Sequence, residues 1–150
     1  MNTSAMTVDA TSRKNPGALA VLVDGPNPAR LADQVKRADT FLTRLVGLLG
    51  RRELPEGEGL WISPCKGIHT MGMRFPIDAL FLDRGNCIVA MREQVVPWRM
   101  TRFFKGAESV LELQAGAISR SGVAVGDRLS FSDADKKTQA RPCRTAGRRP

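Results

Sequence analysis

Residues 77–96 of the 150-residue chain read IDALFLDRGNCIVAMREQVV, and this stretch decides the class of fold. Ile77–Leu82 is almost continuously apolar, which is typical of a strand buried on both faces. Asp83-Arg84-Gly85-Asn86 follows, and both Gly and Asn accept the positive φ angles of a tight turn. Cys87–Val96 then continues as a second strand. The pattern predicts an antiparallel β-hairpin.

Outward from this hairpin, further short segments carry the apolar runs or alternation of strands. Two segments have helical spacing instead: Thr40–Leu49, with Asp39 as N-cap, and Ala117–Ser121, which ends at Gly122. Many short strands with few helices predict a mainly β protein, folded as a compact β-sandwich or barrel with one or two short helices. The further strands are expected at Ala18–Val23, Leu31–Ala38, Gly59–Ser63, Ser109–Gln114 and Asp127–Phe131.

Polar, aperiodic ends flank this region, so we expect a disordered leader over 1–17, one β-rich domain over 18–132 and a disordered basic tail over 133–150. The net charge is +8. The tail holds six basic and two acidic residues, whereas residues 21–132 hold 15 basic and 12 acidic ones. We therefore expect any nucleic-acid affinity to be weak, non-specific, carried by the tail and steeply reduced by salt.

Cysteine usage and hydropathy suggest a compartment. The three cysteines, Cys65, Cys87 and Cys143, form no CxxC pair, so we expect free thiols, with Cys143 the most reactive. No apolar run reaches the ~18 residues of a membrane span. We accordingly expect a cytoplasmic protein with no membrane partner, no cofactor and no metal. Its oligomeric state stays open.

The chemistry-bearing residues gather in residues 64–78, which read PCKGIHTMGMRFPID. His69 is the chain's single histidine, and a lone histidine is usually structural. Its spacing from Cys65 matches no nucleophile–base motif, and zinc would need three or four ligands, with Cys87 the only further candidate. Met71 and Met73 suit a core or an apolar lining. Nucleotide-binding, serine-hydrolase and metalloprotease motifs are absent from the sequence.

Two acidic residues lie in apolar strands. Asp78 follows Ile77 and precedes Ala79 and Leu80, so its carboxylate needs partners. Backbone N–H groups, Arg74 or Arg44 could supply them, and we expect Arg44 to form a buried ion pair with Asp78. Glu112 either lies on the solvent face of an edge strand or joins the same site.

The order and spacing of several short motifs resemble the bacterial and archaeal family known as domain of unknown function 192. The resemblance covers roughly residues 31–131 and implies a jelly-roll-like sandwich or barrel, without implying an activity. It also implies that the family's recurrent polar positions are Arg44, Asp78 and Glu112. Where many members have Trp-Met-Lys-Asn-Thr, this chain has His69-Thr70-Met71-Gly72-Met73, which is similar to a histidine-bearing subgroup. The matching segments are Arg44-x-x-Gly47-Leu48-Leu49, Gly59-Leu60-Trp61-Ile62, Ile68-His69-Thr70-x-Gly72-Met73-x-x-x-Ile77-Asp78 and Val110-Leu111-Glu112-Leu113-x-Ala115-Gly116.

Three functions remain open. The leading hypothesis is a small-ligand-binding module whose pocket is bordered by Trp61–Arg74. The first alternative is a hydrolase or transferase that uses Asp78 and Glu112 as an acid–base pair with His69. The second is a nucleic-acid-associated protein that binds through its tail. The candidate ligand-binding residues form a polar floor and an apolar wall: Arg44, Trp61, His69, Met71, Met73, Asp78 and Glu112.

Overall fold

The computed structural model describes residues 17–25, 28–38 and 48–133. Residues 1–16 of the expected leader, the expected tail from residue 134 onward and residues 39–47 lie outside this part of the chain. Most of the predicted Thr40–Leu49 helix, Arg44 included, therefore lies outside the described residues. The last residues of that segment, Leu48 and Leu49, lie in a turn that continues to Gly50.

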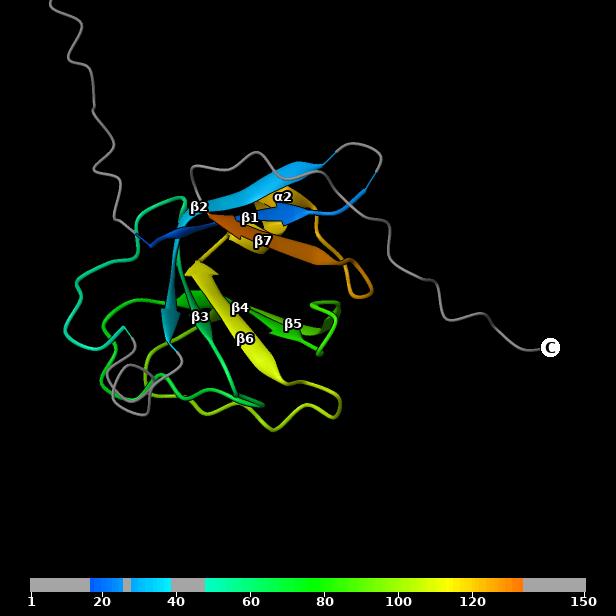
Figure 1. Ribbon diagram of the computed structural model, residues 1–150. Helices are drawn as coiled ribbons and strands as arrows, with labels where there is room; N and C mark the ends of the chain where they lie inside the picture. Colours follow the sequence, from blue (N-terminus) through cyan, green and yellow to red (C-terminus); the bar gives the residue numbers. More distant parts are fainter. Residues whose placement is uncertain (1–16, 26–27, 39–47, 134–150) are drawn as a thin grey trace, which may run out of the picture.

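The described residues form seven strands and one short helix (Figure 1). The prediction of a compact, mainly β fold is confirmed, and two strands and the helix match their expected bounds. The other strands differ by one to two residues at one or both ends, as expected where turn residues can extend or shorten a ladder. The elements are β1 Leu19–Val23, β2 Ala29–Ala38, β3 Glu58–Ile62, β4 Ile77–Leu82, β5 Ile88–Val95, β6 Ser109–Gln114, α2 Ala117–Ser121 and β7 Leu129–Asp133.

The strands make one curled sheet in the order β5-β4-β6-β3-β2-β1-β7. β2 and β3 run parallel, and the other neighbours are antiparallel. The two ends of the sheet meet, because Cys87 beside β5 bridges Arg128 beside β7. Ile88 N donates to Asp127 O at 2.8 Å, and Leu129 N donates to Asn86 O at 2.9 Å. The sheet therefore curls back on itself as a barrel.

The predicted hairpin between β4 and β5 is present. Asn86 has a φ of 61°, in the left-handed region that its side chain tolerates. The Asp83 carboxylate accepts hydrogen bonds from Gly85 N at 2.8 Å and Cys87 N at 2.9 Å. Local turn chemistry thus sets the register of these two strands.

Apolar side chains pack on both faces of the sheet. One cluster draws on β1, β2, β4, β5, β6, β7 and α2, and fills the inside of the barrel. A second cluster lies on the outer face of β3, β6 and β4, where loop residues such as Leu54, Ile68 and Phe104 cover it. Because both faces are covered, β4 is buried at every residue.

The edge-strand interpretation of Glu112 is wrong. β6 pairs with β4 on one side and with β3 on the other, so it is a central strand. Glu112 is only 4% exposed. Alternation in β6 misled the prediction, because the second face of the sheet is covered by loops that local periodicity does not reveal.

Candidate functional site

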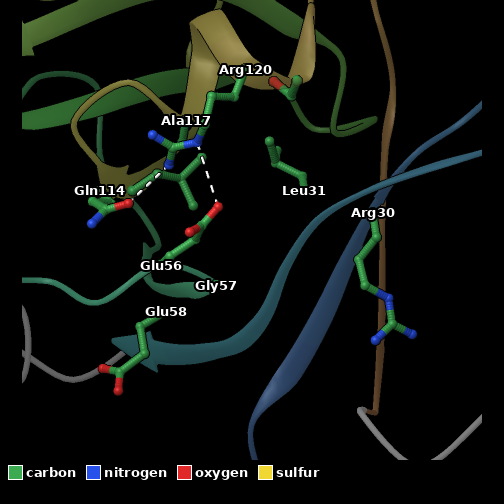
Figure 2. Close-up of a pocket in the computed structure, with 10 residues that line it drawn as sticks. Arg30, Leu31, Glu56, Gly57, Glu58, Gln114, Ala117 and Arg120 are labelled. Atoms are coloured by element: carbon green, nitrogen blue, oxygen red, sulfur yellow. Dashed lines mark hydrogen bonds and ion pairs between the residues drawn. The ribbon is translucent and has the colours of Figure 1, made fainter.

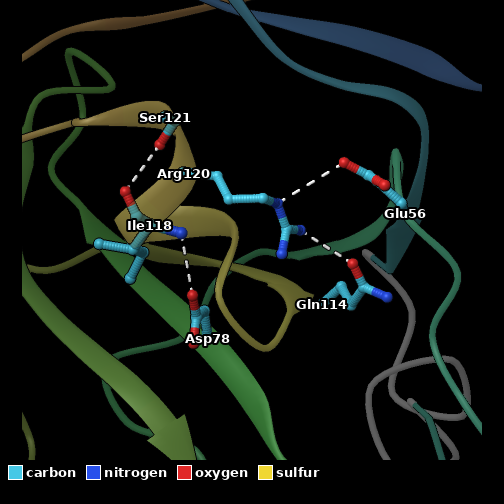
Figure 3. Close-up of polar contacts among 6 residues, drawn as sticks. All are labelled: Glu56, Asp78, Gln114, Ile118, Arg120 and Ser121. Carbon is cyan, nitrogen blue, oxygen red and sulfur yellow. Dashed lines mark hydrogen bonds and ion pairs between the residues drawn. The ribbon is translucent and has the colours of Figure 1, made fainter.

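Asp78 is fully buried inside the barrel, and backbone donors satisfy both of its carboxylate oxygens. Oδ1 accepts from Gln94 N at 2.8 Å, and Oδ2 accepts from Ile118 N at 2.9 Å. Figure 3 shows the second of these bonds, which joins β4 to the first turn of α2. One predicted set of partners, backbone N–H groups, is therefore observed.

The Gln94 bond has a structural cause. The register of β4 and β5 shifts between Ile77 and Ala79, so β5 carries a bulge opposite Asp78. Gln94 has a φ of 48° at this bulge, and its N–H turns to the carboxylate. Asp78 thus holds a β-bulge and a helix terminus together. The predicted ion pair with Arg44 stays a prediction, since Arg44 is outside the described residues.

Asp78 and Glu112 point to opposite faces of the sheet. Glu112 is paired with Ala79, and Asp78 with Leu113, in adjacent antiparallel strands. Paired residues share a face and successive residues alternate, so Asp78 points into the barrel and Glu112 outward. An acid–base pair made of these two carboxyl groups would need them on one face. The structure does not bring them together.

Glu112 lies under the loops on the outer face, between its cross-strand partners Leu60 and Ala79. Burial in these apolar surroundings raises the pKa of Glu112 from 4.5 to about 8. At neutral pH the carboxyl group is therefore mostly protonated and can donate a hydrogen bond. Perturbed groups of this kind mark functional sites more often than chance would, and they also occur as structural residues.

Trp61 lies far from the loop wall that we expected it to form. It pairs with Leu111, so its ring is on the inner face, where it stacks on Phe131 with ring centroids 4.1 Å apart. Arg37 lies over the indole at 5.2 Å. The indole N–H has no hydrogen-bond partner in the described part of the chain. Trp61 and Met73 are consequently on different sides of the sheet.

Residues 66–71 pair with residues 98–104 to form what we call the loop ribbon. His69 bridges Met100 in antiparallel fashion. Thr70 N donates to Arg99 O at 2.8 Å, and Phe104 N donates to Lys66 O at 3.0 Å. Both segments lie at the lower end of the barrel in Figure 1, below β3 and β6. Within the ribbon, His69 and Met71 are exposed, whereas Met73, just beyond it, is buried in the outer cluster.

Thr70 is the anchor of the loop ribbon and is fully buried. Its hydroxyl donates to Val96 O at 2.7 Å and accepts from Arg99 N at 2.9 Å. Its carbonyl accepts from Trp98 N at 3.0 Å. The central motif that sequence reasoning treated as a site thus positions the neighbouring 96–101 loop.

We expect Thr70→Val to lower the free energy of unfolding by roughly 1–3 kcal/mol, because the Arg99 N–H and the Val96 carbonyl lose the buried hydroxyl that they share. Tryptic cleavage after Arg99 should accelerate in the variant. Limited proteolysis and urea denaturation measure both effects. Ser121→Ala, which removes one half-buried hydroxyl bonded to Ile118 O, serves as control. Unchanged cleavage in Thr70→Val would show that this hydroxyl does not hold the loop.

Sequence reasoning missed the exposed apolar side chains of the loop ribbon. Trp98 is 61% exposed, Met100 78% and Phe103 82%. Met71 and Val96 add to this surface at 45% and 46%. Residues 96–105 read VPWRMTRFFK, an alternation of apolar and basic residues that could have been noticed. Apart from Val96, this stretch lies beyond the predicted Cys87–Val96 strand, so no periodic pattern predicted its structure.

A small pocket of about 150 Å³ lies at another place, between the start of β2, the turn before β3 and α2 (Figure 2). Arg120 crosses it, bonded to Gln114 at 2.8 Å and paired with Glu56 at 3.5 Å (Figures 2 and 3). Ligand pockets usually measure ~300–1,000 Å³, so this one is small. None of the seven predicted site residues lines it. Asp78 bonds to α2 through Ile118 N, and Ile118 is not a lining residue either.

Cys65 and Cys87 form no disulfide within the described residues, and each is half-buried. Within the described ranges, no three His, Cys, Asp or Glu side chains lie close enough to hold a metal ion. No helix in those ranges is long and apolar enough to cross a membrane.

The fold and the site residues define the class of this protein as a small β-domain with one curled sheet. It has two buried acids, Asp78 bonded to backbone N–H groups and Glu112 with a raised pKa, and exposed apolar side chains on the loop ribbon. The chain belongs to the domain of unknown function 192 family, described as an uncharacterised family, whose model matches residues 24–131. The resemblance stated from the motifs is confirmed.

Related proteins agree with this assignment. The UPF0127 protein TK1120 of Thermococcus kodakarensis is 27% identical over 117 residues, which cover 75% of this chain and 73% of that protein. A Sinorhizobium meliloti crystal structure, provisionally named a transcription regulator, is 26% identical with a TM-score of 0.65, covering 79% and 97% of the two chains. A Novosphingobium aromaticivorans protein of unknown function has 21% identity and a TM-score of 0.67, covering 87% and 99%, and shares the fold.

Proposed function

We propose that this domain is a binding module whose contact surface is the loop ribbon, and whose ligands are anionic and partly apolar. The observation that carries the proposal is the exposure of Trp98, Met100 and Phe103 on one loop, which hydrogen bonds hold against residues 66–71. Large apolar side chains gathered on an ordered surface mark interaction sites. A binding role also suits a domain in which Asp78 and Glu112 face opposite sides of the sheet.

The backbone at Trp98 supports a functional reason for this side chain. Its φ is 62°, a left-handed conformation that is uncommon for a bulky residue and costs of order 1–3 kcal/mol. An asparagine would occupy that conformation with less strain. A tryptophan that is strained and 61% exposed buries little of its ring in the fold, so the ring is better explained by contact with a ligand.

The basic residues of the loops favour a ligand with negative charge. Residues 64–76 and 96–107 contain five Lys or Arg residues and no Asp or Glu. Elsewhere the described arginines often have acidic partners, such as Arg51 with Glu58 at 2.8 Å. In the described part of the chain, by contrast, no ion pair engages the five basic residues of these loops, which are Lys66, Arg74, Arg99, Arg102 and Lys105. Unpaired cations beside apolar side chains favour an anionic amphiphile.

The probe for this proposal is 8-anilinonaphthalene-1-sulfonate, which is anionic and apolar. We expect the native protein to bind it, and we expect the triple variant Trp98→Asn, Met100→Ser, Phe103→Ser to bind it at least ~10-fold more weakly, because most of the contact area is gone. Fluorescence titration measures both. Val125→Ser, which removes a similarly exposed apolar side chain outside the ribbon, is the matched control. Equal binding by the triple variant and native protein would refute the proposal.

A second candidate is nucleic-acid association. It is supported by the provisional name of the Sinorhizobium meliloti relative and by the six basic residues of 133–150, which lie almost entirely outside the described part. Exposed Trp98 and Phe103 could stack on bases, but Met71, Val96 and Met100 could not. The ribbon's composition therefore favours the amphiphile.

A further inference from the structure

Exposed apolar and basic side chains are interleaved along the loop ribbon. Along 96–105 the exposed apolar residues Trp98, Met100 and Phe103 are interleaved with Arg99, Arg102 and Lys105. The antiparallel partner segment adds Met71 and Lys66 to the same end of the barrel, beside His69 opposite Met100. Exposed apolar and exposed basic side chains therefore alternate along the same loop at this end of the barrel.

Two further contacts hold the surface in shape. The Phe103 ring lies against Gly67, where an added Cβ would approach Phe103 Cδ1 to 2.8 Å. The next residue, Phe104, is buried, and the guanidinium carbons of Arg92 and Arg102 lie 4.8 and 5.3 Å from its ring centroid. Two like charges are thus held against one ring, and no described carboxylate pairs with either. Anionic groups outside the chain would stabilise this arrangement.

We infer that the loop ribbon docks the domain on the surface of an anionic phospholipid bilayer, with Trp98, Met100 and Phe103 in the headgroup–acyl boundary and the neighbouring arginines against lipid phosphates. The inference rests on the proposed function and names the source of its anionic, apolar ligand. Tryptophan favours this boundary, and basic residues near it are attracted by anionic lipids. Absence of a spanning segment led us to expect no membrane partner, but peripheral docking needs no span.

Other occupants fit the surface less well. A second copy of the chain in a two-fold dimer would bring the same five cations of 64–76 and 96–107 against each other. The chain's own segment 133–150 carries six basic and two acidic residues and would be repelled. A single-stranded nucleic acid would leave Met71, Val96 and Met100 without stacking partners.

The test uses the full chain with vesicles of phosphatidylcholine alone or mixed with phosphatidylglycerol. We expect sedimentation with the mixed vesicles only, together with a blue shift of tryptophan emission and its quenching by lipids brominated on the acyl chain. Since Trp61 also emits, both optical changes should disappear when Trp98 is replaced by Asn. The triple variant Trp98→Asn, Met100→Ser, Phe103→Ser should bind at least ~10-fold more weakly. Arg99→Gln with Arg102→Gln should lose roughly fivefold per side chain, and added salt should remove that difference. Val125→Ser and Arg84→Gln are the apolar and basic controls.

Each contrary outcome is informative. Equal vesicle binding by native protein and triple variant would assign the binding to the basic segment 133–150 and overturn the inference. Ribbon-dependent binding of 8-anilinonaphthalene-1-sulfonate without vesicle binding would overturn the inference and leave the proposed function standing. If the loop ribbon supported neither binding of 8-anilinonaphthalene-1-sulfonate nor binding of vesicles, the inference and the proposed function would both be refuted. Ribbon-dependent binding of a single-stranded oligonucleotide that vesicles do not displace would overturn the membrane in favour of nucleic acid. Circular dichroism verifies that each variant is folded.

Discussion

Asp78→Asn is expected to lower the free energy of unfolding by roughly 3 kcal/mol, and Asp78→Ala by more. The carboxylate lies fully buried and accepts from Gln94 N at 2.8 Å and Ile118 N at 2.9 Å. An asparagine keeps one acceptor and turns an amide NH₂ toward the other N–H, so one buried donor loses its partner. The expected loss of roughly 3 kcal/mol is a large share of the ~5–15 kcal/mol that stabilises a typical domain. Urea denaturation measures it.

A matched control exists in the same hairpin. The Asp83 carboxylate also accepts two backbone hydrogen bonds, from Gly85 N and Cys87 N, but in a turn open to water. Asp83→Asn should therefore cost about 1 kcal/mol or less. Hydrogen exchange should accelerate at Gln94 or Ile118 in Asp78→Asn only. Should Asp78→Asn keep native stability while 8-anilinonaphthalene-1-sulfonate binding is lost, Asp78 would be a binding residue and our structural assignment would be wrong.

The second large effect concerns Glu112 and pH. Burial raises its pKa from 4.5 to about 8, so between these values the folded state holds a proton that the unfolded chain has released. The contribution of the protonated Glu112 to the free energy of unfolding is fully present below about pH 4.5 and is lost as the pH rises through about 8. The free energy of unfolding should fall by an amount of order 4–5 kcal/mol across this range.

Glu112→Gln keeps the shape of the protonated acid and removes its titration. At about pH 5 the variant and the native protein should be similarly stable, and at about pH 8 the variant should be the more stable by several kcal/mol. Urea unfolding at both pH values measures this, with the exposed Glu93→Gln as control. A difference that is the same at both pH values would show that the pKa of Glu112 is not raised in the folded state and that its carboxyl group is ionised there.

The strands could be predicted because their signals are local. Ile77–Leu82 and Ser109–Gln114 were expected with the bounds that β4 and β6 have, and Ala117–Ser121 with those of α2. Apolar runs, the Asp83–Asn86 turn and the Gly122 cap each act within a few residues of the chain. The closure of the sheet between Cys87 and Arg128 has no such local signal, because it joins residues 41 positions apart.

The candidate site was predicted less well, for a physical reason. Asp78 and Glu112 look alike in sequence, each an acid in an apolar strand. Which face a strand residue occupies depends on the register with its neighbours, and the pairs Ala79–Glu112 and Asp78–Leu113 put the two acids on opposite faces. Register also decides the face of Trp61: because it pairs with Leu111, its ring lies on the inner face and not in the predicted apolar wall.

The sequence by itself determined the mainly β class, the hairpin and the burial of Asp78, because an acid among apolar strand residues must enter a core and find partners. Tertiary structure alone decided which partners these are: a bulge at Gln94 and the terminus of α2. It also decided that Glu112 is covered from both sides of the strand. The loop that carries Trp98, Met100 and Phe103 lies beside the segment of Met71 because buried Thr70 bonds to Val96 O and Arg99 N, a contact that only the tertiary structure shows. The periodicity of apolar residues predicts the secondary structure of a segment, whereas the contacts between segments depend on their positions in the folded sheet.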